Sequence, residues 1–259
     1  MEKNIIVYFS GTGNTLHIAK HLAASMEDCK VLSIPQIIEN PSLFEIPDRL
    51  GIMFPVHFQS VPFVVEYFIS EILSSKKISD LGYLYVITDS TSHVKGAVHQ
   101  KCAKLLSLSG VHASYYGHVI MPQNLTSHSK EDIQKIVSAA DITMNHIAKD
   151  LKSENIKAAS FIPLKRLTLA LWTHLRNTHT NAAQYFSIDE TRCTGCRRCY
   201  RTCPTNNIEM KSGSPLFLNH CIGCQSCINS CPQNAILKKN KQTNQYLLNG
   251  KHFYEEYRK

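Results

Sequence analysis

Near its start the chain reads Asn4-Ile5-Ile6-Val7-Tyr8-Phe9-Ser10-Gly11-Thr12-Gly13-Asn14-Thr15. The apolar run that ends at Phe9 is typical of a β-strand buried on both faces, and a helix-like stretch follows from Leu16 to about Met26. Between them lies a loop of glycine and hydroxyl residues. Backbone N–H groups and the positive end of a helix dipole face such a loop, so it predicts an anion site. The residues expected to hold a phosphate group are Ser10, Gly11, Thr12, Gly13, Asn14 and Thr15.

The loop departs from two common phosphate-binding motifs. A nucleotide P-loop requires Gly-Lys-Ser/Thr, and this triplet is absent from the sequence. The dinucleotide fingerprint requires a third glycine, and Leu16 stands in its place. The motif is therefore consistent with a different phosphate ligand, or with a tight turn that binds no ligand.

Strand-like and helix-like stretches alternate through the first 157 residues. Further strand-like runs lie at 31–34, 50–54, 83–88 and 113–121, and helix-like stretches lie near 61–74, 95–109 and 130–155. This alternation predicts an α/β fold, a doubly wound parallel sheet covered by helices on both faces. Ligands of such sheets bind outside the carboxyl ends of the strands, and the glycine loop follows the first strand directly.

The glycine loop resembles the FMN-phosphate loop of flavodoxins, in which hydroxyls and amides hold the phosphate without a lysine. The resemblance implies a flavodoxin-like fold, FMN as the cofactor, and two loops that contact its ring. The loop after the third strand would place His57 or Phe58 against the ring, whereas the loop after the fourth is more polar than flavodoxins commonly have. The residues implied are Pro55, Val56, His57 and Phe58 in the first loop and Thr88, Asp89 and Ser90 in the second.

Histidines are the other candidates for chemistry in this part of the chain. The sequence contains 13 of them, and most are expected at the surface or at the edge of the core, including His118. His57 and His93 lie in the two flavin loops. A histidine there could stabilise reduced FMN or relay a proton.

One cysteine pattern occurs twice, as Cys193-x2-Cys196-x2-Cys199-x3-Cys203-Pro and as Cys221-x2-Cys224-x2-Cys227-x3-Cys231-Pro. Four soft thiolates at this spacing are typical of a cubane iron–sulfur cluster. Residues 187–238 resemble a bacterial-type ferredoxin with two [4Fe-4S] clusters, which implies that the fourth cysteine of each run ligates the other run's cluster. Zinc would need only four ligands per ion, and disulfide frameworks belong to secreted domains. The expected cluster ligands are Cys193, Cys196, Cys199, Cys203, Cys221, Cys224, Cys227 and Cys231.

We therefore expect four segments along the chain. They are a flavodoxin-like FMN-binding domain at 1–157, a helical connector at 158–186, the ferredoxin domain at 187–238 and a C-terminal tail at 239–259. Leucines recur at helical spacing in the connector, at 164, 167, 171 and 175, with basic residues elsewhere around the axis. Such a helix could lie on a membrane surface, but packing between the domains is the simpler interpretation.

Charge and hydropathy narrow the classes of partner. The net charge is +8, with 11 basic and 5 acidic residues in 187–259 against 14 and 15 in 1–157. We expect no nucleic-acid partner, because no basic run is interleaved with aromatic residues. No apolar stretch reaches the eighteen or so residues that a membrane-spanning helix needs. A chain without a signal peptide that carries oxygen-sensitive cluster ligands is expected in the cytoplasm.

The order of the two modules resembles the EFR1-type family of ferredoxin–flavodoxin fusions from anaerobic prokaryotes. The resemblance implies an iron–sulfur flavoprotein that passes single low-potential electrons between two [4Fe-4S] clusters and FMN, in either direction. A separate redox protein, a ferredoxin or a reductase, would be the partner. Two alternatives remain: an FMN-dependent reductase that acts on a small molecule with electrons from ferredoxin, and a redox sensor. Direct use of a nicotinamide cofactor is disfavoured, because no fingerprint for it is present.

Arginines surround the first cysteine run, at positions 192, 197, 198 and 201. Positive charge favours the more negative, reduced form of a cluster. We therefore predict the higher potential for the cluster held by Cys193, Cys196, Cys199 and Cys231. The same arginines could dock an acidic carrier, an interaction that salt would weaken.

Overall fold

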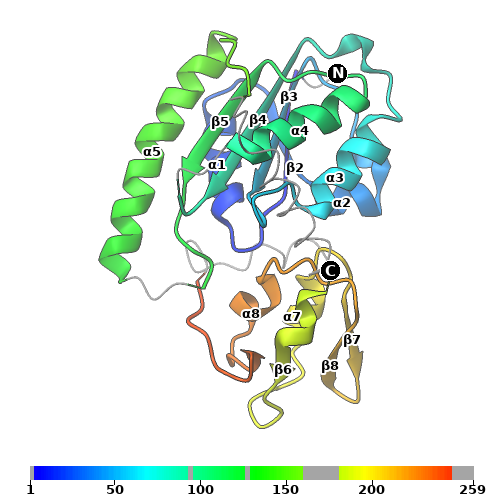
Figure 1. The fold of residues 1–259 in the computed structure, drawn as a ribbon, viewed down its shortest axis with the longest axis vertical. Coiled ribbons are helices and arrows are strands. Elements are labelled where there is room, and N and C mark those ends of the chain that lie inside the picture. The colour runs from blue at the N-terminus through cyan, green and yellow to red at the C-terminus, as the bar shows by residue number, and fades with distance from the viewer. Residues whose placement is uncertain (1–2, 93–95, 126–128, 160–180, 247–259) are drawn as a thin grey trace. The chain divides into compact units, whose positions relative to one another are not determined.

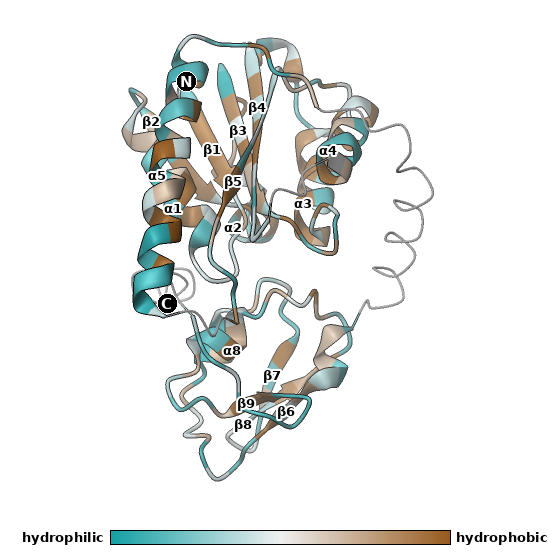
Figure 2. Cartoon of the chain, turned by 60° about the vertical axis from the view of Figure 1, so that its left-hand side comes forward, coloured by the Kyte–Doolittle hydropathy of each residue, from teal (hydrophilic) through white to brown (hydrophobic). Residues whose placement is uncertain are grey.

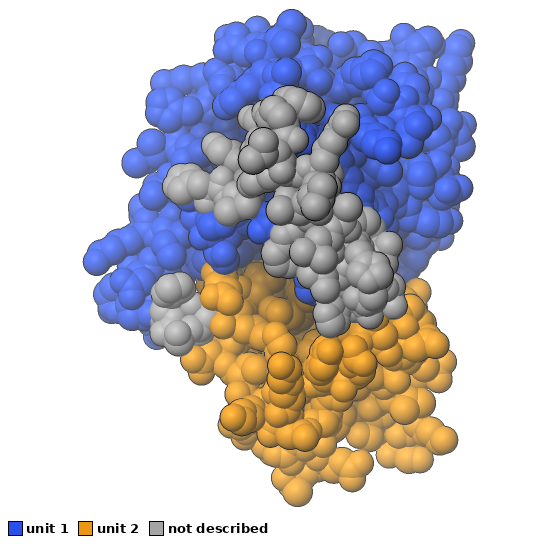
Figure 3. Space-filling model, in the orientation of Figure 1, with its two compact units in different colours: residues 1–10, 14–122, 129–175 blue, residues 11–13, 123–128, 176–259 orange. Residues whose placement is uncertain are grey.

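A computed structural model of the chain describes residues 3–92, 96–125, 129–159 and 181–246. Contacts within the chain divide it into two compact units (Figure 3). Unit 1 consists of Met1–Ser10, Asn14–Pro122 and Ser129–Leu175, and unit 2 consists of Gly11–Gly13, Gln123–His128 and Arg176–Lys259. The predicted leucine-rich helix of the connector and the tail after residue 246 lie outside the described residues.

Unit 1 contains a five-stranded sheet in which every pair of neighbouring strands is parallel (Figure 1). Its strands are β1 (Asn4–Tyr8), β2 (Cys29–Ser33), β3 (Arg49–Pro55), β4 (Tyr83–Ser90) and β5 (Tyr115–Ile120). They lie in the order β2-β1-β3-β4-β5, which is the flavodoxin-like order of a doubly wound sheet. The predicted fold class is confirmed, and each predicted strand is present with ends shifted by a few residues.

Helices cover both faces of this sheet. The helices are α1 (Asn14–Ala24), α2 (Ile34–Glu39), α3 (Phe63–Tyr67), α4 (Gly96–Leu108) and α5 (Lys130–Lys152). Thr15 of α1 bonds Asp89, whereas His99 of α4 bonds the preceding residue Thr88. Successive residues of a strand point to opposite faces, so α1 and α4 lie on opposite sides of the sheet.

Two helical features differ from the prediction. Helix α2 was missed, because its six residues are too few to show a helical period and Pro35 stands at its start. The stretch predicted as one helix at 61–74 is α3 followed directly by a π-helix at Phe68–Leu73. Short 3-10 turns complete the unit at Pro41–Leu43 and Ile78–Asp80.

The core of unit 1 is formed by the strands and by one side of each helix. All five residues of β1 are buried, and so are the first seven of β4. Figure 2 shows the hydrophobic residues concentrated on the strands, whereas hydrophobic and hydrophilic residues alternate along the helices. Gly51 of β3 leaves room for the ring of Tyr85, because a Cβ atom there would lie 2.5 Å from ring carbons. Burial of these strands is the main stabilising contribution to the unit.

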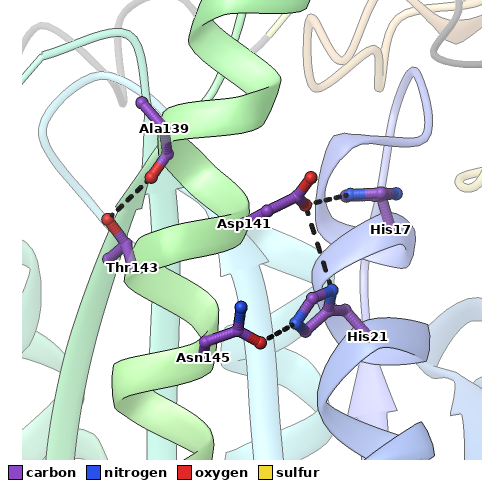
Figure 4. Close-up of polar contacts among 6 residues, drawn as sticks. All are labelled: His17, His21, Ala139, Asp141, Thr143 and Asn145. Carbon is purple, nitrogen blue, oxygen red and sulfur yellow. Dashed lines mark hydrogen bonds and ion pairs between the residues drawn. The ribbon is translucent and has the colours of Figure 1, made fainter.

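Polar side chains join α1 to α5 at the surface (Figure 4). Asp141 lies 3.3 Å from Nε2 of His17 and 3.9 Å from Nδ1 of His21, and Nε2 of His21 lies 2.9 Å from the amide oxygen of Asn145. These side chains are partly exposed, so water screens their charges and the pairs stabilise the unit only slightly.

The described part of unit 2 contains two small antiparallel sheets and two short helices. Strand β6 (Phe186–Ile188) pairs with β9 (Ile236–Lys238), and β7 (Ile208–Lys211) pairs with β8 (Ser214–Phe217). The helices are α7 (Arg198–Arg201) and α8 (Ser226–Ser230), and a 3-10 turn at Ala182–Tyr185 precedes β6. Ile208, Ile228 and Ile236 form an apolar core with several of the cysteines.

The described start of the tail packs on unit 2, a choice that the sequence left open. The amide of Gln245 donates hydrogen bonds to the carbonyls of Ile228 and Cys231, at 2.6 and 2.7 Å. The backbone N–H of Tyr246 donates to the side-chain oxygen of Asn229, and Tyr246 itself is 5% exposed. These residues therefore cover α8.

Within the described residues, no helix has the length and apolar content that crossing a membrane requires.

Candidate functional site

The eight cysteines of unit 2 fall into two sets that do not follow the order of the runs. Burial raises the pKa of Cys199, and Cys231, Cys196 and Cys193 raise it further. Burial likewise raises the pKa of Cys227, and its main thiol neighbours are Cys224, Cys203 and Cys221. Electrostatic influence of this kind falls off with distance, so each set gathers in one place. The first set is Cys193, Cys196, Cys199 and Cys231, and the second is Cys203, Cys221, Cys224 and Cys227.

A cavity in unit 2 is lined by all four thiols of the first set. Apolar side chains form much of the remaining wall, and Arg197 and Arg198 also line it. Four thiolates in one apolar cavity repel one another and are poorly solvated, so they require a positive metal core to remain ionised together. The donor set and the cavity therefore fit a cluster with four cysteine ligands.

The two cysteine runs repeat the same local geometry. In the first run Gly195, Arg197 and Asn206 have positive φ, and the equivalent residues of the second run, Gly223, Gln225 and Asn234, do as well. A backbone N–H donates to the sulfur of the last cysteine in each run, from Asn207 to Cys203 at 3.2 Å and from Ala235 to Cys231 at 3.3 Å. Such N–H···S bonds stabilise negative charge on the sulfur and help to set a cluster's potential.

Among the described residues, no three His, Cys, Asp or Glu side chains are grouped so that they could hold a single metal ion.

The loop predicted to bind a phosphate group lies between β1 and α1. The side chains of Ser10, Thr12, Asn14 and Thr15 are all buried, at 5% exposure or less. Asn14 donates to the carbonyl of Pro122 at 2.8 Å, and the Thr12 hydroxyl donates to Asn124 at 2.7 Å. The segment after β5 thus adds partners that the sequence analysis missed. Its position after the last strand, at the same edge of the sheet, was the available signal.

Asp89, beside this loop, is a buried carboxyl group. It is 3% exposed, and its carboxylate accepts a hydrogen bond of 2.6 Å from the Thr15 hydroxyl. Burial raises the pKa of Asp89 to about 7, although the bond from Thr15 acts in the opposite direction. When Asp89 is protonated, its own O–H can donate to Thr15, which leaves the Thr15 hydrogen for a phosphate oxygen.

The first predicted flavin loop ends in a tight turn. His57 and Ser60 bond each other through both backbone groups, and the two residues between them, Phe58 and Gln59, have φ of 48° and 58°. Phe58 is 43% exposed. His57 packs edge-on against Phe9, with ring centroids 5.8 Å apart. Burial of the imidazole lowers the pKa of His57 to about 4. His57 is therefore neutral near pH 7.

The side chains of the second predicted flavin loop point to opposite faces of the sheet. Thr88 is fully buried and lies between His99 and His118, whereas Asp89 lies on the α1 side. Ser90 is partly exposed and bonds His118. His99 was not predicted, because a single histidine on a helix carries no pattern, and His93 lies outside the described residues.

Comparison with known proteins identifies one of the two units directly. Residues 192–236 match the family model described as a 4Fe-4S dicluster domain. No curated protein sequence matches the chain.

Solved structures that resemble the chain include a flavodoxin from the domain Archaea (15% identity, TM-score 0.38, covering 57% of this chain and 99% of that chain). Others are a flavoprotein in complex with FMN from Lactobacillus acidophilus NCFM (12%, 0.35, 46% and 93%) and rubredoxin oxygen:oxidoreductase from Desulfovibrio gigas (17%, 0.39, 59% and 37%). The chain thus spans 37% of the length of the last of these. The assignment of the fold rests on the strand order of unit 1 and not on these structures. The chain combines a flavodoxin-like unit with a 4Fe-4S dicluster domain, whose eight cysteines imply two clusters.

Proposed function

We propose that this protein is an electron-transfer iron–sulfur flavoprotein. It passes single low-potential electrons between two [4Fe-4S] clusters in unit 2 and FMN in unit 1, and it serves a separate redox protein. We also place it in the EFR1-type family of ferredoxin–flavodoxin fusions and in the cytoplasm of an anaerobe. The combination of a dicluster domain and a flavodoxin-like unit in one chain supports an electron-transfer role.

The arrangement of the thiols carries the cluster half of this proposal. Four cysteines line one cavity, and one of the four, Cys231, comes from the other run. A cubane cluster transfers one electron at a time. Cys199 of the first set and Cys227 of the second belong to the same apolar core, so electrons would have a short, dry path between the clusters.

The loop at residues 10–15 would hold the FMN phosphate. Backbone N–H groups at the start of α1 and the Thr15 hydroxyl are the donors that suit a phosphate group without a lysine. Phe58 and His57 would lie against the flavin ring from the first loop, and Ser90 would contribute from the second. When bound, FMN supplies one- and two-electron redox chemistry, which allows single electrons to be collected and delivered as a pair.

The partner is expected to be a redox protein with an acidic surface. Arg192, Arg197, Arg198 and Arg201 lie around the first run. Arg192 and Arg197 are exposed, and Arg198 and Arg201 are partly exposed. Opposite charges would increase the rate of encounter and make it sensitive to salt. A free ferredoxin or a reductase has the required chemistry.

One experiment tests the proposal as a whole. The full chain is purified without oxygen, its iron, sulfide and FMN are quantified, and reduced ferredoxin is added while the flavin absorbance is followed. We expect about eight irons and one FMN per chain, from two cubanes and one flavin site, with reduction of the flavin by ferredoxin. A double variant, Cys196→Ser with Cys224→Ser, should retain FMN but lose this reduction. Four irons or fewer, zinc, or a chain without FMN would overturn the proposal.

One observation favours the alternative, a reductase that acts on a small molecule at its own FMN. Asp89 and His118 lie at the carboxyl end of the sheet, where they could supply protons to a substrate. Steady consumption of reduced ferredoxin with a small electron acceptor, and without a partner protein, would establish this activity in place of the carrier role.

A further inference from the structure

Asp89 and the loop at residues 10–15 share one hydroxyl group. Asp89 lies at the carboxyl end of β4, and Thr15 lies in the first turn of α1, where the loop ends. The Thr15 hydroxyl donates to Oδ1 of Asp89 at 2.6 Å, and the two residues are 1% and 3% exposed. A buried carboxyl group is therefore fixed beside the donors that are expected to hold a phosphate group.

The number of hydrogens on this pair limits what the loop can bind. A threonine hydroxyl has one hydrogen, and an ionised carboxylate has none. While Asp89 is ionised, its carboxylate and a phosphate oxygen would compete for the single Thr15 hydrogen. Once Asp89 is protonated, its own O–H donates to the Thr15 oxygen, and the Thr15 hydrogen can turn to a phosphate oxygen. The pair therefore suits a phosphate group best when it carries one added proton.

Charge acts in the same direction as the number of hydrogens. Above pH 7 a phosphate monoester carries nearly two negative charges, because its second pKa is about 6. A buried carboxylate next to such a group is poorly solvated and is also repelled, and both effects favour its protonated form. A bound phosphate group should therefore raise the pKa of Asp89 beyond the value of about 7 that burial already gives it.

The titratable side chains of α1 and of the loop after β3 do not supply a compensating charge. On α1, His17 lies 3.3 Å from Asp141 of α5, and Lys20 is exposed. In the loop after β3, His57 is neutral near pH 7, since burial lowers its pKa to about 4. Neither element therefore holds a positive charge against Asp89.

The histidines of α4 and β5 lie on the other face of the sheet. His99 and His118 both bond the hydroxyl of Thr88, which precedes Asp89 in the strand and so points the opposite way. Among the described residues, burial and the bond from Thr15 are the two causes that act on the pKa of Asp89. A proton is then the simplest source of the charge that a bound phosphate group calls for.

We propose that the loop at residues 10–15 takes up a proton when it binds a phosphate group, and that Asp89 is the residue that holds this proton. The proton comes from solvent and stays on the Asp89 carboxyl group, so the complex carries one negative charge fewer than its separate components. The assignment of FMN as the ligand rests on the proposed function. Asp89 thereby makes the affinity for FMN depend on pH, with weaker binding as the pH rises above 7.

Titration calorimetry measures the proton directly. The full chain is prepared without oxygen and freed of FMN, and FMN is added at pH 8 in two buffers that differ in their enthalpy of ionisation. The difference in binding heat gives the number of protons taken up. We expect about one proton per FMN, because Asp89 is mostly ionised at this pH before binding and free FMN has already lost both phosphate protons.

Two variants assign this proton to a residue. Asp89→Asn should abolish the uptake, because an amide is not protonated in this range. Asp80→Asn makes the same chemical change at an exposed residue and should retain the uptake. No uptake by the unmodified protein, or equal uptake by Asp89→Asn, would overturn the inference.

Dissociation constants provide a second test. Between pH 7.5 and 8.5 the Kd for FMN should rise by close to tenfold in the unmodified protein, as expected for one linked proton, and stay nearly constant in Asp89→Asn. Phenyl phosphate, a monoester without a flavin ring, should show the same pH dependence. If FMN bound with equal pH dependence to both proteins, the inference alone would fail. If phenyl phosphate bound with proton uptake and FMN did not bind, the proposed function would fail and the inference would stand. If neither bound, both would fail.

Discussion

Asp89 is a single residue through which pH acts on unit 1. Its carboxyl group is buried at the end of β4 and accepts a hydrogen bond from the neutral hydroxyl of Thr15. A carboxylate in such a position is poorly solvated, and for this reason its pKa is raised from 3.8 to about 7. At pH values between 3.8 and about 7, Asp89 of the folded protein holds a proton that the unfolded chain has released. The stability of the fold should therefore fall as the pH rises through this window.

We predict that Asp89→Asn removes this dependence and stabilises the protein above pH 7. The largest gain in the free energy of unfolding, on the order of 4 kcal/mol, follows because the pKa of Asp89 is raised by about three. This gain should vanish near pH 4. The measurement is urea unfolding of the full chain from pH 5 to pH 8, followed by circular dichroism. Asp80→Asn, at an exposed residue, is the control and should leave the slope unchanged. Equal pH slopes in the unmodified protein and in Asp89→Asn would contradict this account.

At the scale of elements, the last cysteine of each run is the clearest case of a residue whose role depends on another segment. Cys231 follows α8 but lines the cavity formed by Cys193, Cys196 and Cys199. Cys203 follows α7 but lies among the cysteines of the second run. The two runs are therefore expected to fold as one cooperative element, since neither can complete a cluster alone.

Paired substitutions distinguish this interleaving from clusters built within each run. Cys196→Ser with Cys231→Ser should remove one cluster, because both residues belong to the same set. Cys224→Ser with Cys231→Ser should remove both clusters. Iron content and EPR spectra of the reduced proteins, prepared without oxygen, provide the measurement. If the second pair lost one cluster and the first pair lost both, each run would hold its own cluster.

A serine caps the N-terminus of helix α5. The Ser129 hydroxyl accepts a hydrogen bond of 3.1 Å from the backbone N–H of Asp132, and acidic residues fill the first turn. Ser129→Ala removes this cap and should lower the free energy of unfolding by about 1 kcal/mol. Thr143→Ala, in the middle of the same helix, should cause no loss, since alanine favours helix. Thermal unfolding of both variants gives the comparison, and equal melting temperatures would argue against a stabilising cap.

At the scale of the whole molecule, charge is concentrated in the part of the chain that carries the clusters. Residues 187–259 contain 11 basic and 5 acidic residues, whereas residues 1–157 are nearly balanced. Two of the arginines, Arg197 and Arg198, line the cavity of the first cysteine set. Their positive charge favours the reduced cluster, so this cluster is predicted to have the higher potential of the two.

Arg197→Glu with Arg198→Glu should lower the potential of that cluster by tens of millivolts, as a Coulomb estimate for nearby, partly screened charges suggests. The other cluster should change less. A matched control, Lys238→Glu with Lys239→Glu, makes the same change in net charge at residues that do not line the cavity. Reductive titration followed by EPR measures both potentials. Unchanged potentials in the arginine variant would refute the electrostatic explanation.

Much of the fold was predictable because its signals are local. The strand at 4–8, the loop and helix α1 follow one another in the sequence, and buried parallel strands are continuous apolar runs. Helix α2 was missed because six residues cannot show a period, and the π-helix at 68–73 was missed because its pattern resembles an ordinary helix. The fold class therefore followed from the sequence, and the irregular elements did not.

The candidate sites divide in the same way. Cysteine spacing and the glycine loop are contiguous motifs, so the sequence by itself predicted the cluster ligands and the position of a phosphate-binding loop. The resemblance to ferredoxins already implied that Cys231 joins Cys193, and both residues line one cavity in the structure. Only the tertiary structure decided that Asp89 is buried against Thr15 and that Thr88 links His99 to His118. Each of these relations joins residues on different elements, and burial sets their chemistry. No local pattern records which distant side chains share a dry, low-dielectric site.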